Sequence, residues 1–169
     1  MTRKGQITLE SLLLYGVAIL VVLLAVGALT YFGILDLGRL LPDRCNLASA
    51  GTLSCDEWRV ERSNVPSDAD RVHLGLRNIG ASALIVESVA FYPDGSDRDE
   101  QQQYCNVTLS GADRNLPSGS IEAYELVCGG QAITQSLGQK ARGDLEIVYT
   151  QAGGAVEQRV GGQLIATVS

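Results

Sequence analysis

The residues whose types and spacing carry the clearest chemistry in this sequence are its four cysteines, Cys45, Cys55, Cys105 and Cys128. An even number of thiols in an oxidising compartment is typical of disulfides. Three pairings are possible, and we favour Cys45 with Cys55 and Cys105 with Cys128, because each bond joins segments near in sequence. Metal ligation is the alternative, but the chain lacks a Cys-x-x-Cys pair and its only histidine, His73, lies on the polar face of a predicted strand. We therefore predict two disulfides and no metal.

Carboxylates are the other groups that could support acid–base chemistry. The candidates lie in polar, turn-like segments, where a solvated surface is the expected role: Asp56, Glu57, Asp68, Asp70, Asp94, Asp97, Asp99 and Glu100. The chain has no Gly-x-Ser-x-Gly nucleophile motif, no phosphate-binding loop and no metal-ligand spacing. We therefore predict that the protein is not an enzyme and needs no cofactor.

One sequence motif is a candidate for covalent modification. Asn106-Val107-Thr108 is the only Asn-x-Ser/Thr triplet in the chain and follows Cys105 directly. Such a triplet accepts an N-linked glycan when it lies on an exposed surface outside the cytoplasm. Asn106 is therefore a possible glycosylation site.

Glu10 is a single carboxylate at the start of a long apolar run, residues 11–35, which carries no formal charge. As a helix rising about 1.5 Å per residue, this run would be about 37 Å long, enough to cross a hydrocarbon core of about 30 Å. Arg3 and Lys4 precede it, so the positive-inside rule places the N-terminus in the cytoplasm and the rest of the chain outside. A charge near hydrocarbon is unfavourable, by up to about 3 kcal/mol at the bilayer centre, so we expect Glu10 to have a function.

The residues after the apolar run are expected to form one external domain, 41–169. Residues 71–78 alternate, with Val72, Leu74 and Leu76 on one face, as in a half-buried strand. Seven further segments bounded by turn residues are strand candidates: 58–62, 84–92, 105–109, 121–127, 143–150, 155–160 and 163–168. The predicted fold class is α+β, with a long N-terminal hydrophobic helix over 6–40 followed by an all-β, sandwich-like domain.

The charge of the chain restricts its partners. It has 19 acidic and 13 basic residues, a formal net charge of −6 at pH 7. Phosphate backbones are bound by clustered Lys and Arg, so we expect no nucleic-acid partner.

The N-terminal residues resemble those of a known family. Lys4-Gly5-Gln6-Ile7-Thr8-Leu9-Glu10, followed directly by the apolar run, is similar to the class III signal peptide of archaeal type IV pilins. In that family a prepilin peptidase cuts before a Gln-x-Ser/Thr-x-Glu sequence. The resemblance implies a leader of residues 1–5, a cut between Gly5 and Gln6, and Glu10 as the fifth mature residue.

The resemblance also implies a function and a set of partners. The chain would be a precursor in the cytoplasmic membrane that then polymerises with copies of itself into an extracellular pilus, through the N-terminal helix. An assembly ATPase and a membrane platform protein would be required, and adhesion would be the common use. Glu10 would neutralise the new amino terminus of a neighbouring subunit. Two alternatives stay open, a membrane-anchored binding protein that never polymerises and an archaellum filament subunit.

Overall fold

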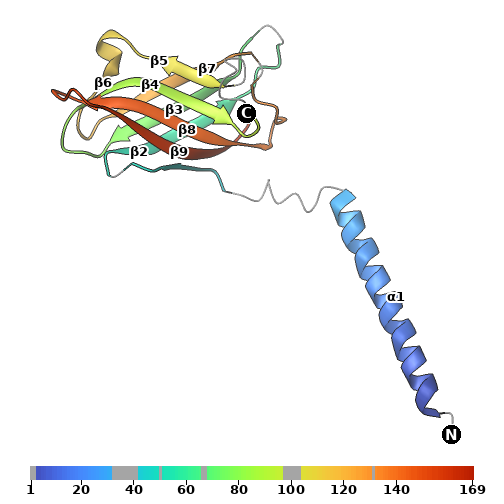
Figure 1. Cartoon of the computed structure of the whole chain (residues 1–169). Coiled ribbons are helices and arrows are strands. Elements are labelled where there is room, and N and C mark those ends of the chain that lie inside the picture. The colour runs from blue at the N-terminus through green and yellow to red at the C-terminus, as the bar shows by residue number, and fades with distance from the viewer. Residues whose placement is uncertain (1–2, 32–41, 50, 66–67, 97–103, 131) are drawn as a thin grey trace. The chain divides into compact units, whose positions relative to one another are not determined.

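The computed structural model describes residues 3–31, 42–49, 51–65, 68–96, 104–130 and 132–169 (Figure 1), with side chains described from Ser11 onward except at 112–113. The chain divides into two units, Met1–Leu40 and Leu41–Ser169, and each is considered by itself. The division coincides with the predicted boundary between the helix over 6–40 and the domain over 41–169. The predicted continuation of the helix over 32–40 lies outside the described residues.

The first unit contains one long helix, α1 (Arg3–Tyr31). Within it, Ser11–Tyr31 is a stretch of 21 residues long and apolar enough to cross a membrane. At about 1.5 Å per residue this stretch is about 31 Å long, close to the thickness of a hydrocarbon core. Gly16 and Gly27 lie inside the helix and are tolerated there, because a glycine weakens a helix by only about 1 kcal/mol.

The second unit is built from strands. In chain order they are β1 (Arg44–Leu47), β2 (Leu53–Glu61), β3 (Arg71–Asn78), β4 (Leu84–Pro93), β5 (Cys105–Thr108), a 3-10 turn (Gly111–Arg114), β6 (Asn115–Leu116), β7 (Ile121–Cys128), β8 (Lys140–Gln151) and β9 (Glu157–Thr167). All neighbouring strands pair antiparallel, in the order β1-β9-β8-β4-β5-β7-β3-β2, and β6 pairs with β4.

This sheet nearly closes into a barrel, because its two outermost strands, β1 and β2, are joined. Cys45 of β1 is bonded to Cys55 of β2. At the end of β2, Val60 forms a parallel bridge with Val168, and the Ser169 amide donates to the Val60 carbonyl at 3.0 Å. The α+β class is confirmed. The sandwich is not, since β5 pairs with both β4 and β7 and so links all strands into one sheet.

Two of the predicted strands are a single strand. Segments 155–160 and 163–168 were predicted as separate strands, bounded by turn residues, yet β9 runs through both Gly161 and Gly162. A Cβ at Gly162 would lie 2.5 Å from the Asn46 carbonyl oxygen of β1. Glycine is therefore needed there for close strand packing and not for a turn.

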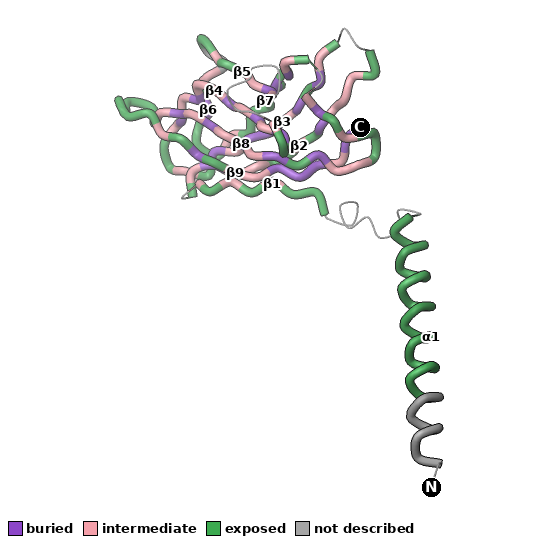
Figure 2. Tube along the Cα trace, turned by 45° about the vertical axis from the view of Figure 1, so that its right-hand side comes forward, coloured by how far each residue is buried: buried purple, intermediate pink, exposed green. Residues whose placement is uncertain are grey.

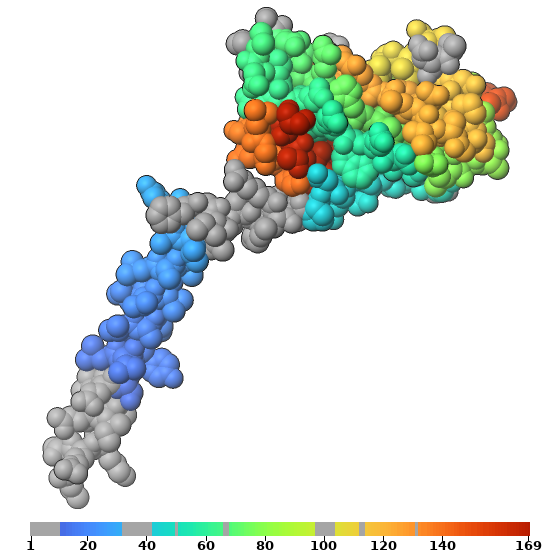
Figure 3. Space-filling model, turned by 180° about the vertical axis from the view of Figure 1, so that it is seen from behind, coloured from blue at the N-terminus to red at the C-terminus, as the bar shows by residue number. Residues whose placement is uncertain are grey.

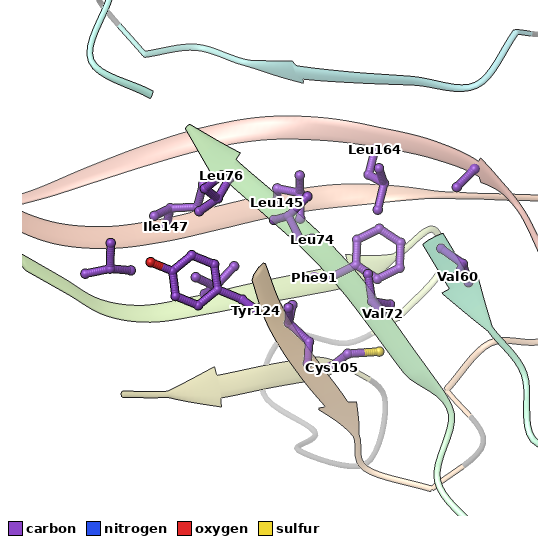
Figure 4. Packing of buried hydrophobic residues seen from close by; sticks show 14 of the residues in the cluster. Val60, Val72, Leu74, Leu76, Phe91, Cys105, Tyr124, Leu145, Ile147 and Leu164 are labelled. Carbon is purple, nitrogen blue, oxygen red and sulfur yellow. The ribbon is translucent and has the colours of Figure 1, made fainter. Parts of the chain in front are cut away.

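The core lies between the inward faces of the strands (Figure 2). Val72, Leu74 and Leu76 of β3 are completely buried, as their alternation predicts. Opposite them lie Leu145, Ile147 and Leu164 of β8 and β9, with Phe91 of β4 among them (Figure 4). Burying a side chain of this size stabilises a fold by roughly 1.5–3 kcal/mol, so the set dominates the stability of the domain.

One polar group in this core has no partner among the described residues, the hydroxyl of Tyr124 on β7. The side chain is 4% exposed and points into the barrel (Figure 4). Burial, with a smaller effect of the Glu122 carboxylate, raises the pKa of Tyr124 from 10.0 to about 12. The neutral phenol is thus favoured by the folded state.

We expect Tyr124→Phe to leave the free energy of unfolding unchanged or to increase it by up to about 1 kcal/mol, because an unpaired buried hydroxyl is unfavourable. Between pH 10 and 12 the folded state keeps a proton that the unfolded state has lost, so the wild type should lose stability as the pH rises through this range. The free energy of unfolding of Tyr124→Phe should fall less over the same pH range. Urea unfolding at pH 8 and pH 11 measures both effects; a destabilisation above about 1 kcal/mol at pH 8 would show that the hydroxyl has a partner.

Candidate assembly helix and other sites

Most of the exposed large hydrophobic side chains of the described residues lie on α1. Every residue from Ser11 to Tyr31 is exposed, although nearly all are apolar (Figure 2). Leucines and valines follow one another around the whole circumference, so the helix has no polar face to turn to water. Such a helix is stable only where lipid or other apolar helices cover it on all sides.

A shallow hollow of about 420 Å³ lies on α1 above Gly16. It is lined by Leu12, Leu13, Gly16, Val17 and Leu20. A Cβ at Gly16 would meet nothing within 4 Å, so the surface above this glycine is open. Four side chains around a small residue form the kind of hole that receives a side chain from a neighbouring helix. Sequence inspection misses this feature because the chain lacks a Gly-x-x-x-Gly pair on this helix.

Near the end of α1, the hydroxyl of Thr30 is compatible with an apolar environment. Thr30 Oγ1 donates within its own helix, at 2.8 Å to the Gly27 carbonyl and 3.1 Å to that of Val26. A hydroxyl bonded in this way needs no water. Thr30 is therefore no obstacle to an apolar environment around this part of the helix.

The residues that carry the pilin resemblance lie at the start of α1. The backbone of Gly5, Gln6 and Glu10 belongs to the helix, which begins at Arg3. Their side chains are outside the described residues. The cut between Gly5 and Gln6 and the assembly role of Glu10 therefore stay predictions.

The four cysteines form the two disulfides that the sequence favoured. Cys45 is bonded to Cys55, with 6.0 Å between their Cα atoms, and Cys105 to Cys128, with 3.7 Å. Both bonds lie where backbone pairing is weak. The first joins the outermost strands of the sheet, and the second joins β5 to β7, which share only two residue pairs. Each disulfide thus connects two strands that few backbone hydrogen bonds hold together.

The possible glycosylation site is on the outer face of the sheet. Cys105 is completely buried, so its neighbour Asn106 points outward, because successive side chains of a strand alternate. Asn106 is half-buried and lies between Ala90 of β4 and Val127 of β7. Its position permits a modification but does not show one.

Asp70 is the carboxylate that sequence reasoning placed wrongly. It is completely buried, not on the solvated surface. One carboxylate oxygen accepts from the Ser63 amide and the other from the Ile133 amide, both at 2.9 Å. The side chain therefore joins the loop before β3 to the loop after β7, a structural role that its turn-like sequence does not reveal.

His73 lies beside a hollow on the outer face of β2, β3 and β7, the side of the domain seen in Figure 3. The hollow has a volume of about 670 Å³. His73 Nε2 is 3.4 Å from a carboxylate oxygen of Glu61, and both side chains are about 40% exposed. Nearby, Arg77 bonds Asp56 at 2.9 Å. Among the described residues no three His, Cys, Asp or Glu side chains are grouped as metal ligands.

Comparisons with known proteins do not place this chain in a family. No family model matches the sequence, and a search of curated proteins finds no match. Function is therefore inferred from the apolar helix, the leader-like sequence at its start and the disulfide-bonded domain that follows.

Proposed function

We propose that this chain is a structural subunit of an extracellular filament of the type IV pilus kind, anchored in the cytoplasmic membrane before assembly. The observation that supports this most directly is α1, which is membrane-length, apolar on all sides and exposed along its whole described length. In the precursor, lipid would cover this surface. In the filament, the same surface would pack against α1 of other subunits.

The N-terminal sequence supports the same proposal. A basic leader removed at Gly5–Gln6 on the cytoplasmic side would take away Arg3 and Lys4 without removing the apolar anchor. A prepilin peptidase would make the cut, and an assembly ATPase with a membrane platform protein would move the subunit into the filament. The disulfide-bonded β-domain would form the outer surface, where adhesion to cells or other surfaces takes place.

The decisive experiment is electron microscopy of filaments sheared from the cells, with N-terminal sequencing of their main subunit. We expect ordered filaments that contain this chain, starting at Gln6. Protein that stays entirely in the membrane fraction, with no filaments, would contradict polymerisation and favour a membrane-anchored binding protein, which the length of α1 also permits. Loss of swimming after deletion of the gene would instead indicate an archaellum subunit.

A further inference from the structure

Asn106 begins a row of outward-facing residues that crosses four neighbouring strands. Asn106 pairs with Ala90 of β4, Ala90 with Glu146 of β8, and Glu146 with Gly161 of β9. In Figure 1 these strands follow one another from β5 at the top to β9 below. Residues paired in this way point to the same side of a sheet, so all four positions lie on one outer face.

Small residues keep the path along this row open. Ala90 carries a single methyl group, and a Cβ placed at Gly161 would meet nothing within 4 Å. Around Gly161 the surface is hollowed, with a volume of about 550 Å³. The outward side chains that line this hollow are Tyr92, Asp144, Glu146 and Arg159.

The lining has the chemistry that a saccharide requires. The ring of Tyr92 lies 5.1 Å from that of Tyr104, and the two planes are tilted by 34°. Aromatic rings pack against the apolar faces of sugars, while carboxylates and guanidinium groups bond sugar hydroxyls. Glu146 and Arg159 are already paired with each other at 3.3 Å, which holds an acceptor and a donor side by side at the hollow.

We propose that a glycan linked to Asn106 lies along this row, over Ala90 and into the hollow beside Tyr92, Glu146 and Arg159. The occupant follows from the position of the sequon, whose asparagine is the first residue of the same row. Adjacent strands are about 4.8 Å apart, so Gly161 on β9 lies three strands, or about 14 Å, from Asn106, within reach of a short oligosaccharide. A glycan at Asn106 requires that the domain lies outside the cell, as the proposed function does, but it does not require that the chain forms filaments.

The test compares the full-length wild type with Asn106→Gln, both purified from cells that glycosylate Asn-x-Ser/Thr sites. Intact mass reports glycan occupancy. The rate of nitration of Tyr92 and Tyr104, followed by peptide mass spectrometry, reports whether the rings are covered. We expect the wild type to carry a glycan and its two tyrosines to react several-fold more slowly than in Asn106→Gln.

Two further variants distinguish coverage of the Tyr92 ring by the glycan from the presence of a glycan on Asn106. Gly161→Gln places a side chain in the hollow, where it would displace the glycan, and leaves the sequon intact, so it should keep the glycan mass but lose most of the protection that the glycan gives to Tyr92. Val156→Gln, at an exposed position of the β8–β9 turn outside the row, should keep both. This pair controls for a general effect of a longer side chain on β9 or its turn.

Three outcomes would overturn the proposal. A wild type without a mass difference from Asn106→Gln, beyond that of the substitution, would show that Asn106 carries no glycan. Equal nitration rates in an occupied wild type and Asn106→Gln would show that the glycan points into solvent. Equal rates, with protection only when free oligosaccharide is added, would make the hollow a receptor for saccharides in solution. None of these readouts depends on filament formation.

Discussion

Glu10→Ala is expected to abolish ordered filaments while leaving the protein in the membrane. In a filament built on α1, the carboxylate of Glu10 would lie among apolar helices, opposite the amino group of a neighbouring subunit. Removing one partner of a buried ion pair typically destabilises a structure by 3–5 kcal/mol, because the other charge is left uncompensated. A loss of about 3 kcal/mol weakens each contact on the order of 100-fold, and the loss recurs at every subunit.

The matched control is Glu57→Ala, which removes an exposed carboxylate of β2. It should assemble normally, because substitutions at such sites change stability by no more than about 0.5 kcal/mol. The measurement is the amount of sheared filament per cell, with the amount of chain in the membrane fraction as the reference. Normal filaments in Glu10→Ala would remove the assembly role of Glu10.

Asp70→Ala is expected to be among the most destabilising single substitutions in the β-domain, by on the order of 3–5 kcal/mol. The change leaves the buried amide of Ile133 and the part-buried amide of Ser63 without their acceptor, and hydrogen bonds to a charged group each contribute about 1.5–3 kcal/mol. The backbone of Asp70 is bonded to Gly130 and Cys128, where β3 begins and β7 ends, and these bonds do not depend on the carboxylate. The expected loss is therefore that of the two side-chain bonds. Among the described side chains of the two loops, no other one accepts hydrogen bonds from both the Ser63 and the Ile133 amides.

Urea unfolding of the full chain in detergent can measure this effect by fluorescence, because Trp58 is the only tryptophan and packs against the core. With a urea dependence of about 2 kcal/mol per M, the midpoint should fall by about 2 M. Asp70→Asn keeps the volume and one acceptor oxygen, and should fall between Asp70→Ala and the wild type. Asp68→Ala, at an exposed ion pair of 3.9 Å, should change the free energy of unfolding by less than about 1 kcal/mol. An equal, small effect of both alanine variants would contradict the role of Asp70.

Most strands could be predicted because their periodicity is local. Residues 71–78 alternate along the sequence, and β3 has these bounds in the structure. Strands β1 and β6 were not predicted, since four and two residues are too short to show a period. The favoured cysteine pairing also depended only on short separations in sequence, of 10 and 23 residues.

What could not be predicted depends on contacts between distant residues. A pair of glycines such as Gly161-Gly162 is typical of a turn. In the structure β1 lies against β9, and the Asn46 carbonyl occupies the space that a side chain at position 162 would need. Asp70 reads as surface until Ile133, 63 residues further on, approaches its carboxylate. The hollow at Gly16 is visible only once the helix has a three-dimensional surface.

The sequence by itself determined the membrane-length helix, the leader-like motif and a separate domain of short strands, and it favoured the cysteine pairs, because charge, length and periodicity act over a few neighbouring residues. Only the tertiary structure decided that the strands form one nearly closed sheet, that each disulfide holds a weakly paired joint, and that Asn106 shares an outer row with a hollow lined by Tyr92 and Glu146. Strand order and register bring together residues far apart in the chain, and no local pattern encodes which strands will be neighbours.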